Sequence, residues 1–329
     1  MKVLHTVARY LVGGLFIFSG LIKINDPVGT QIKLEEYFTV FAIDIAPFFN
    51  SLKPASLFLS ITLSTLEVVL GIALLLKFKE KLTAPILLGM IVFFTFLTFY
   101  SAYFNKVTDC GCFGDAIKLT PWQSFGKDVV LLFFIVILFM KRNSVTESVG
   151  KVSTIAVGVS LVLSLLISFN AIRHLPVIDF RAYKIGTDLN TAILPPPDDP
   201  TAVPAITNYA LWGDESDFTF ESLRGNKLLI IVHDVEKTNM DAYLPLTSLV
   251  SALGRDVESV AITASAGPDF EALRHDVQLA IPYFYSDKTL LKTMIRSNPG
   301  LVLLQDGVVM AKWHFNDIPS AAEVIRTLQ

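Results

Sequence analysis

The two cysteines of this 329-residue chain stand one residue apart, within the segment Thr108-Asp109-Cys110-Gly111-Cys112-Phe113-Gly114-Asp115. Thiolates are the nucleophiles of disulfide exchange, so two of them within bonding reach form a reversible two-electron couple. A single intervening residue forces a tight ring, which suits Gly111 because glycine adopts backbone angles that other residues avoid. Cys110 and Cys112 are therefore candidate catalytic residues for thiol–disulfide exchange, and Gly111 is the candidate turn residue between them.

Two other roles for the cysteine pair stay open. A disulfide across so short a loop removes little entropy from the unfolded chain, so a purely structural bridge would stabilise only weakly. Two thiolates could bind copper(I), whereas structural zinc needs four ligands and the sequence offers no partner pair of His or Cys. Neither Asp109 nor Asp115 would favour a thiolate, which leaves Lys106 or backbone groups to stabilise one. We prefer the redox interpretation and assign no metal.

Apolar segments on both sides of the cysteines indicate a membrane-embedded region. Hydrophobic residues make up 52% of the chain and charged residues 17%, whereas about 25% of residues are charged in ordinary soluble domains. The apolar excess falls in residues 1–172, and 173–329 has the composition of a soluble domain. The formal net charge of −3 gives no indication of nucleic-acid binding. Membrane lipid and other proteins are therefore the expected partners.

Five segments are long enough to cross a hydrocarbon layer of about 30 Å as helices. A signal peptide is the competing interpretation of the first, but no cleavage site follows it, and we expect an uncleaved helix. The expected spans are, in order, 6–24, 55–76, 85–104, 123–140 and 153–171. Between the first two, residues 26–53 suggest an interfacial helix, broken by Pro47 and Pro54. The apolar face of that helix would consist of Leu34, Tyr37, Phe38, Phe41 and Ile45.

The distribution of Lys and Arg among the short loops predicts the orientation of these spans. Eight of them fall on one side, at Lys2, Arg9, Lys77, Lys79, Lys81, Lys141, Arg142 and Lys151. Four fall on the other side, at Lys33, Lys53, Lys106 and Lys118. This asymmetry predicts a multi-pass protein of the bacterial cytoplasmic (inner) membrane with its N-terminus inside. The cysteine loop and residues 173–329 would then both lie in the periplasm.

Glu67 is the charged residue expected in the middle of a span. An ionisable group inside a membrane is costly, and it is by default a functional-site candidate. Glu67 could equally be a neutral carboxylic acid that is hydrogen-bonded to a neighbouring helix. Lys23, Lys127 and Asp128 are expected near the outer boundary of the bilayer, where long side chains reach the surface without any functional role.

Residues 205–329 alternate strand-like and helix-like segments, after a proline-rich connector over 173–204. The expected strands are 227–233, 257–263, 283–285, 301–305 and 308–315, and the expected helices are 240–253, 269–277, 288–295 and 320–328. Pro245 predicts a kink inside the first of these helices. Asp306-Gly307 is a strong signal for a two-residue hairpin turn. The order predicts three layers around a mixed sheet.

This order resembles the thioredoxin fold, particularly its membrane-associated TlpA-like branch, over residues 212–329. In that family a redox Cys-x-x-Cys follows the first long strand, and Lys237-Thr238-Asn239-Met240 stand at that place here. Pro299 matches the cis-proline of the family. The resemblance therefore implies a thioredoxin-like domain that lacks the catalytic thiols and binds a partner or serves as a scaffold.

The membrane half resembles two related families. The run Gly13-Gly14-Leu15-Phe16-Ile17-Phe18-Ser19-Gly20-Leu21-Ile22-Lys23, followed by Asp26-Pro27, resembles the first helix of DoxX-type proteins. Glu67-Val68-Val69-Leu70-Gly71 and Asp109-Cys110-Gly111-Cys112-Phe113-Gly114 resemble the MauE branch, which matches over about residues 5–142. That branch is linked to methylamine utilisation and to the disulfide formation or maturation of an exported enzyme subunit, alongside a thioredoxin-like partner. We assign no methylamine-specific role.

Together these features predict a membrane all-α bundle of about five transmembrane helices over 1–172 and a thioredoxin-like α/β domain over 205–329. The expected function is thiol–disulfide exchange, or maturation of exported proteins, through Cys110 and Cys112, with Glu67 as a polar element in the bundle. An exported thiol-containing client or a thioredoxin-like protein would be the partner. The alternatives are a non-catalytic assembly factor with a structural disulfide and a quinone-linked oxidoreductase subunit. For the latter, the DoxX resemblance makes quinone the candidate cofactor.

Overall fold

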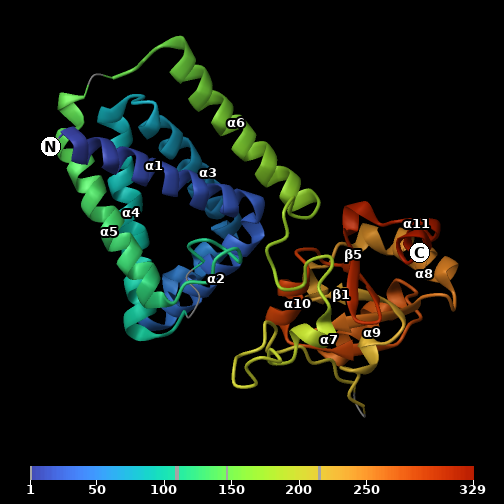
Figure 1. The fold of residues 1–329 in the computed structure, drawn as a ribbon. Helices are drawn as coiled ribbons and strands as arrows, with labels where there is room; N and C mark the ends of the chain where they lie inside the picture. The colour runs from blue at the N-terminus through green and yellow to red at the C-terminus, as the bar shows by residue number, and fades with distance from the viewer. Residues whose placement is uncertain (1, 108–110, 146, 214–215) are drawn as a thin grey trace. The chain divides into compact units, whose positions relative to one another are not determined.

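The computed structural model describes residues 2–107, 111–145, 147–213 and 216–329, and it divides into two compact units, Met1–Ile172 and Arg173–Gln329 (Figure 1). Cys110 lies outside the described residues, as do the two residues before it.

Among the described residues of the N-terminal unit, five helices are long and apolar enough to cross a membrane, which confirms the predicted number. They are α1 (Lys2–Asn25), α3 (Ser56–Leu75), α4 (Glu80–Phe104), α5 (Pro121–Lys141) and α6 (Lys151–Arg173), and the 3₁₀ segment Pro47–Ala55 leads into α3. Helix α5 begins with a capping box, in which Thr120 and Gln123 satisfy each other's backbone N–H groups. Its first residue is a proline, whose missing N–H is not needed at that position.

Helices α1, α3, α4 and α5 share one apolar core. It consists of Ala8, Val12, Phe16, Leu70, Leu74, Leu87, Met90, Ile91, Leu131, Ile135 and Leu138. In lipid, helices associate through close packing and polar contacts rather than through the hydrophobic effect. The contacts between these helices therefore decide which side chains meet inside the bundle.

Small residues bring α1 and α3 unusually close together. A Cβ atom added to Gly20 would lie 2.6 Å from Cγ2 and 2.9 Å from the backbone nitrogen of Val68. A Cβ added to Gly71 would lie 2.8 Å from the carbonyl oxygen of Gly13. These approaches are possible only with glycine, as in other membrane helix pairs built on small residues. They place Lys23, at the end of α1, beside Glu67 of α3.

Helix α2 (Pro27–Asp44) packs against α3 and buries most of its predicted apolar face. Leu34, Tyr37, Phe38 and Phe41 are all buried. Ile45 is 54% exposed, so the prediction that it shares this face was wrong. The reason is local, because the helix ends at Asp44 and the chain direction changes after it.

The C-terminal unit has the mixed sheet and the covering helices of a thioredoxin-like fold, as predicted. Its strands are β1 (Asn226–Val232), β2 (Glu258–Thr263), β3 (Tyr283–Tyr285), β4 (Gly300–Gln305) and β5 (Val308–His314). The sheet order is β3-β2-β1-β4-β5, in which β1, β2 and β3 are parallel and β4 runs antiparallel to both β1 and β5. The hairpin turns through Asp306 and Gly307, with φ of 46° and 82°, and the Asn298–Pro299 bond is cis.

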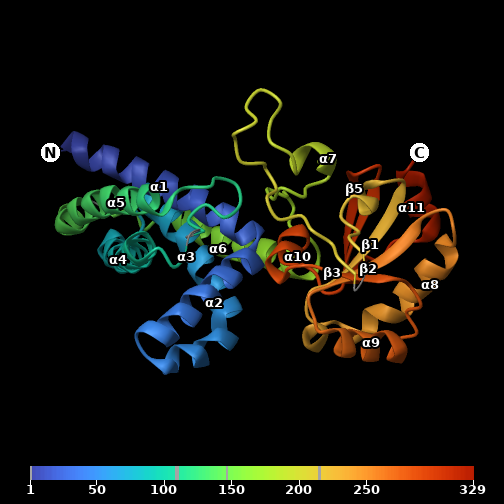
Figure 2. The same cartoon turned by 90° about the horizontal axis from the view of Figure 1, so that it is seen from below.

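Helices lie on both sides of this sheet (Figures 1 and 2). Helices α8 (Tyr243–Leu253), α9 (Gly267–Asp276) and α11 (Ala321–Thr327) contribute to one core, and α10 (Lys288–Met294) contributes to the other. Along β1, Leu229 and Ile231 belong to one core while Leu228 and Ile230 belong to the other. The strand is thus buried on both faces, which explains its uninterrupted apolar sequence.

The predicted kink at Pro245 was wrong. A 3₁₀ turn over Met240–Ala242 precedes α8, which itself begins only at Tyr243. Pro245 therefore lies in the first turn, where its missing N–H has no intrahelical partner to lose. The helix needs no bend to accommodate it.

The residues that precede β1 contact the outer strand β5 in two ways, through backbone hydrogen bonds and through a buried cluster of charged side chains. Gly186 donates its N–H to the carbonyl of Val309 at 2.8 Å, and Val309 donates back to Thr187 at 2.9 Å. Nearby, Asp179 accepts hydrogen bonds from Arg181 Nε at 2.7 Å and from Lys312 Nζ at 2.6 Å. Together these bonds fasten the start of the unit to β5 (Val308–His314).

Candidate functional site

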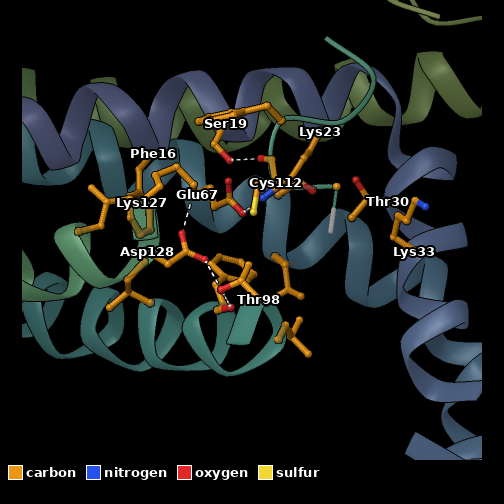
Figure 3. A pocket seen from close by; sticks show the side chains of 18 of the residues that line it. Phe16, Ser19, Lys23, Thr30, Lys33, Glu67, Thr98, Cys112, Lys127 and Asp128 are labelled. Atoms are coloured by element: carbon orange, nitrogen blue, oxygen red, sulfur yellow. Dashed lines mark hydrogen bonds and ion pairs between the residues drawn. The ribbon is translucent and has the colours of Figure 1, made fainter. Parts of the chain in front are cut away.

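A cavity inside the N-terminal unit is lined by several buried polar side chains (Figure 3). Helices α1 to α5 and the loop that follows the cysteines all line it, around an empty volume of about 800 Å³ that is partly open. Its polar lining includes Ser19, Lys23, Thr30, Lys33, Glu67, Thr98, Cys112, Lys127 and Asp128, and most of the remaining wall consists of leucine and phenylalanine side chains. Apolar clefts in which a few polar groups converge commonly hold small molecules or reacting groups.

Cys112 brings its sulfur to this cavity (Figure 3). Its carbonyl oxygen accepts a hydrogen bond from Ser19 Oγ of α1 at 3.0 Å. The next residue, Phe113, is buried with its ring centroid 5.5 Å from that of Phe18. These contacts fasten the second cysteine of the pair to α1. The pairing of Cys112 with Cys110 remains a prediction.

Gly111 has the backbone that the sequence analysis expected of a turn residue. Its φ is +66°, a conformation that side-chain-bearing residues rarely adopt. A Cβ atom at this position would also lie 3.1 Å from Cγ of Lys33 on α2. The cysteine segment therefore passes close to α2, and it does so through a residue that has no side chain.

Gly111→Val should be expressed and inserted but should fail to form the normal Cys110–Cys112 couple. A β-branched side chain at positive φ is strained by about 1–3 kcal/mol, and it must also displace Lys33. The measurement is the midpoint of the dithiol–disulfide equilibrium in purified protein, titrated with a thiol buffer. Gly126→Val is a suitable control, because no atom lies within 4 Å of a Cβ there. An unchanged midpoint in Gly111→Val would contradict the assigned turn role.

Glu67 forms an ion pair with Lys23 in the cavity wall. Lys23 Nζ lies 2.6 Å from Glu67 Oε1 and 4.8 Å from the centre of the Phe94 ring. Glu67 is 1% exposed and Lys23 9%. The side chain of Lys23 was expected to reach the surface at the bilayer boundary, but its ammonium is turned into the bundle because α1 and α3 approach each other closely. Of the two interpretations of Glu67, the contact with a neighbouring helix is present, and its partner is a cation.

A second polar group comes from α5. Asp128 is 1% exposed and accepts a hydrogen bond from Thr98 Oγ1 of α4 at 2.9 Å. Lys127 pairs with the same carboxylate, and its ammonium lies 5.3 Å from the centre of the Phe113 ring. Asp128 was likewise expected to reach the surface at the boundary, and its side chain is instead buried in the bundle. Since α5 begins at Pro121, Asp128 lies about two turns inside the helix, on the side that packs against α4.

Lys106, which the sequence offered as a cation for a thiolate, has another partner. Its ammonium lies 2.5 Å from Asp44 Oδ1 at the end of α2. Hydrogen bonds from Lys106 and then Tyr100 hold the pKa of Asp44 below its usual range. Lys127 instead lies close enough to Cys112 for the two to interact electrostatically. A cation beside a cysteine favours the reactive thiolate form.

Sequence reasoning thus found Cys112 and Glu67 but missed Lys23, Lys127 and Asp128 as members of one site. One available signal was that Lys and acidic residues interrupt the apolar segments in equal numbers. Buried charges are seldom found without partners, so these residues could have been expected to pair with one another. A second signal was the glycine pattern of α1 and α3, which indicates the faces that meet.

Comparison with known proteins agrees with the division of the chain into an N-terminal and a C-terminal unit. The family model of methylamine utilisation protein MauE matches residues 1–141. Protein TlpB of Flavobacterium psychrophilum is 28% identical over 168 residues, which are 48% of this chain and 42% of TlpB, so the chain spans less than half of that relative. No solved structure matches the chain. The matched range contains α1 to α5, the cavity and the cysteine loop: residues 1–141 of this protein form a MauE family domain.

Proposed function

We propose that this membrane protein exchanges disulfides with exported proteins through Cys110 and Cys112. The observation that carries the proposal is the position of Cys112, whose sulfur faces the partly open cavity that Lys127 also lines. A neighbouring cation lowers the cost of the thiolate that disulfide exchange requires. A purely structural disulfide would have no need of charged groups beside its sulfur atoms.

The exchange transfers two electrons and two protons between the cysteine pair and a client. In the oxidising direction, a client thiolate attacks one sulfur of the Cys110–Cys112 disulfide, and the other cysteine leaves as a thiolate. A second client thiol then attacks the mixed disulfide, which releases the oxidised client and the reduced pair. The reducing direction passes through the same mixed disulfide with the roles reversed.

The C-terminal domain would dock the client or a redox partner rather than exchange thiols itself. Its fold is thioredoxin-like, but the chain has no cysteine beyond Cys112. The 3₁₀ turns Val235–Lys237 and Met240–Ala242 occupy the segment between β1 and α8, where the redox motif of that fold belongs. Because the domain keeps the fold but has no thiols, we assign it the role of binding a client or a redox partner.

Replacing either cysteine by serine tests the proposed function. Cys110→Ser and Cys112→Ser should each abolish client oxidation or reduction in cells without lowering the amount of the membrane protein. The redox state of exported thiol proteins can be followed by the gel shift that a bulky maleimide causes. If both variants keep full activity, the redox proposal is wrong and a non-catalytic assembly role with a structural bridge replaces it.

We also propose that the protein lies in the bacterial cytoplasmic membrane, with the cysteine loop and residues 173–329 in the periplasm. The support is the distribution of Lys and Arg among the short loops and helix ends, with eight on the side of the N-terminus and four on the side of the cysteine loop. An alkaline phosphatase fusion, which is active only outside the cytoplasm, should therefore work after Gln329 and fail after Lys79. The opposite pattern would reverse the orientation.

A further inference from the structure

The charges around Cys112 are balanced only while Cys112 keeps its proton. Each of the three ammonium groups at the cavity is paired with a carboxylate: Lys23 with Glu67 at 2.6 Å, Lys33 with Glu36 at 3.2 Å, and Lys127 with Asp128. A Cys112 thiolate would add a negative charge to this set, and an uncompensated charge inside a membrane bundle costs several kcal/mol. This cost is avoided only if one of the neighbouring carboxylates takes up a proton when the thiolate forms.

Glu67 is the carboxylate prepared to do so. Its Oε1 accepts from Lys23, but its Oε2 is buried and has no hydrogen-bond partner among the described residues. None of the other described polar side chains that line the cavity has such an atom. Leaving a buried charged oxygen without a partner is costly, and protonation removes that cost. The other carboxylate at the cavity, Asp128 of α5, already accepts hydrogen bonds from Thr98 and Lys127.

Lys127 connects the groups that would exchange the proton. Its ammonium interacts electrostatically with Cys112, with Asp128 and with Glu67. The interaction with Cys112 is the largest of the three and that with Glu67 the smallest, so the cation favours a negative charge on the sulfur over one on Glu67. Moving a proton between them then leaves the total charge of the cavity unchanged.

We propose that Glu67 accepts the proton of Cys112, so that thiol and carboxylate share one proton while Lys127 stabilises the thiolate. The step is Cys112–SH + Glu67–COO⁻ → Cys112–S⁻ + Glu67–COOH, and no charge enters or leaves the site. When Cys112 is the leaving group in an exchange, it takes the same proton back from Glu67. This inference rests on the proposed function for its purpose, but it concerns the ionisation of Cys112 alone.

The test uses the full chain with Cys110→Ser, in which Cys112 is the single thiol. The rate of its alkylation by iodoacetamide, a small uncharged reagent, is measured against pH in detergent micelles. A shared proton gives a rate that rises in two steps, with a plateau between them where the internal proton transfer does not depend on pH. The titratable groups lining the cavity are Lys23, Lys33, Tyr37, Glu67, Lys127 and Asp128.

Two variants in the same background separate the roles. Glu67→Gln removes the internal acceptor, so the plateau should disappear and leave a single step, with a rate that changes about tenfold per pH unit below its midpoint. Lys127→Gln keeps the acceptor but removes the cation, so the plateau should remain and fall by about tenfold, the equivalent of one pKa unit. Asp44→Asn is the matched control, because Asp44 pairs with Lys106 and does not line the cavity. Its profile should equal that of the parent.

A single step in the parent, or a plateau that survives Glu67→Gln, would overturn the inference. If Glu67→Gln fails to fold, the parent profile and Lys127→Gln still decide, since a single step in the parent is sufficient to reject a shared proton. No client takes part in this measurement. Its result is therefore separate from the fate of the proposed exchange, which the two serine variants test in cells.

Discussion

Replacing Asp179 by alanine should destabilise the C-terminal domain by about 3–5 kcal/mol, because it strands two buried cations. The side chains of Arg181 and Lys312 are each 2% exposed, and both bind the Asp179 carboxylate. Hydrogen exchange of β5 (Val308–His314) in the full chain would report the loss. Asp198→Ala, at an exposed position of the proline-rich segment, should change stability by less than about 0.5 kcal/mol. Equal protection in both variants would contradict the assignment.

The same cluster predicts how the domain responds to acid. Burial alone would raise the pKa of Asp179, but the charges of Arg181 and Lys312 outweigh it and lower the pKa to about 2, from 3.8. A carboxyl whose pKa is lowered by folding stabilises the folded state fully above its unfolded pKa. That stabilisation is lost as the pH falls from about 4 to about 2. Asp179→Ala should lack this part of the acid response.

Gly20→Ala should destabilise the N-terminal unit by about 1–3 kcal/mol, whereas Gly14→Ala should not. The new methyl group at Gly20 would collide with the backbone of Val68 and lie 3.0 Å from Cβ of Glu67. At Gly14 no atom lies within 4 Å, and alanine there improves helix propensity by up to about 1 kcal/mol. Both positions belong to α1, so the pair separates packing from propensity.

Thermal unfolding in detergent micelles measures both glycine variants. Separating α1 from α3 should also lengthen the contact between Lys23 and Glu67, so the alkylation profile of Cys112 should change in Gly20→Ala as well. Equal melting temperatures for Gly20→Ala and Gly14→Ala would show that the two helices tolerate a wider spacing, and the account of their packing would then be wrong.

Several features could be predicted from the sequence because they depend on local chemistry. The length and apolarity of the spans predicted five helices, and the observed bounds differ from the expected ones by a few residues. Asp306-Gly307 predicted the β4–β5 hairpin, since both residues tolerate the positive φ that the turn requires. The alternation of strands and helices predicted the thioredoxin-like sheet.

The composition of the site could not be predicted in this way. Hydropathy places Lys23 and Asp128 along their helices but does not say which neighbour each side chain meets. That depends on how closely α1 approaches α3 and on which side of α5 faces α4, both of which are tertiary contacts. For the same reason, the cation near Cys112 proved to be Lys127 and not Lys106, although Lys106 is closer in sequence.

The most direct test of Cys110 and Cys112 as a redox couple is to trap their covalent intermediate. A variant that keeps one cysteine cannot resolve a mixed disulfide, so the adduct with the client persists. Each single-serine variant is purified from cells after acid quenching, and its adducts are identified by mass spectrometry. At least one of the two should carry exported thiol proteins that a reductant releases, while the double-serine variant should carry none. If neither variant forms an adduct, and the Cys110–Cys112 disulfide of the parent resists reduction by thiol buffers, the pair is structural and the proposed exchange does not occur.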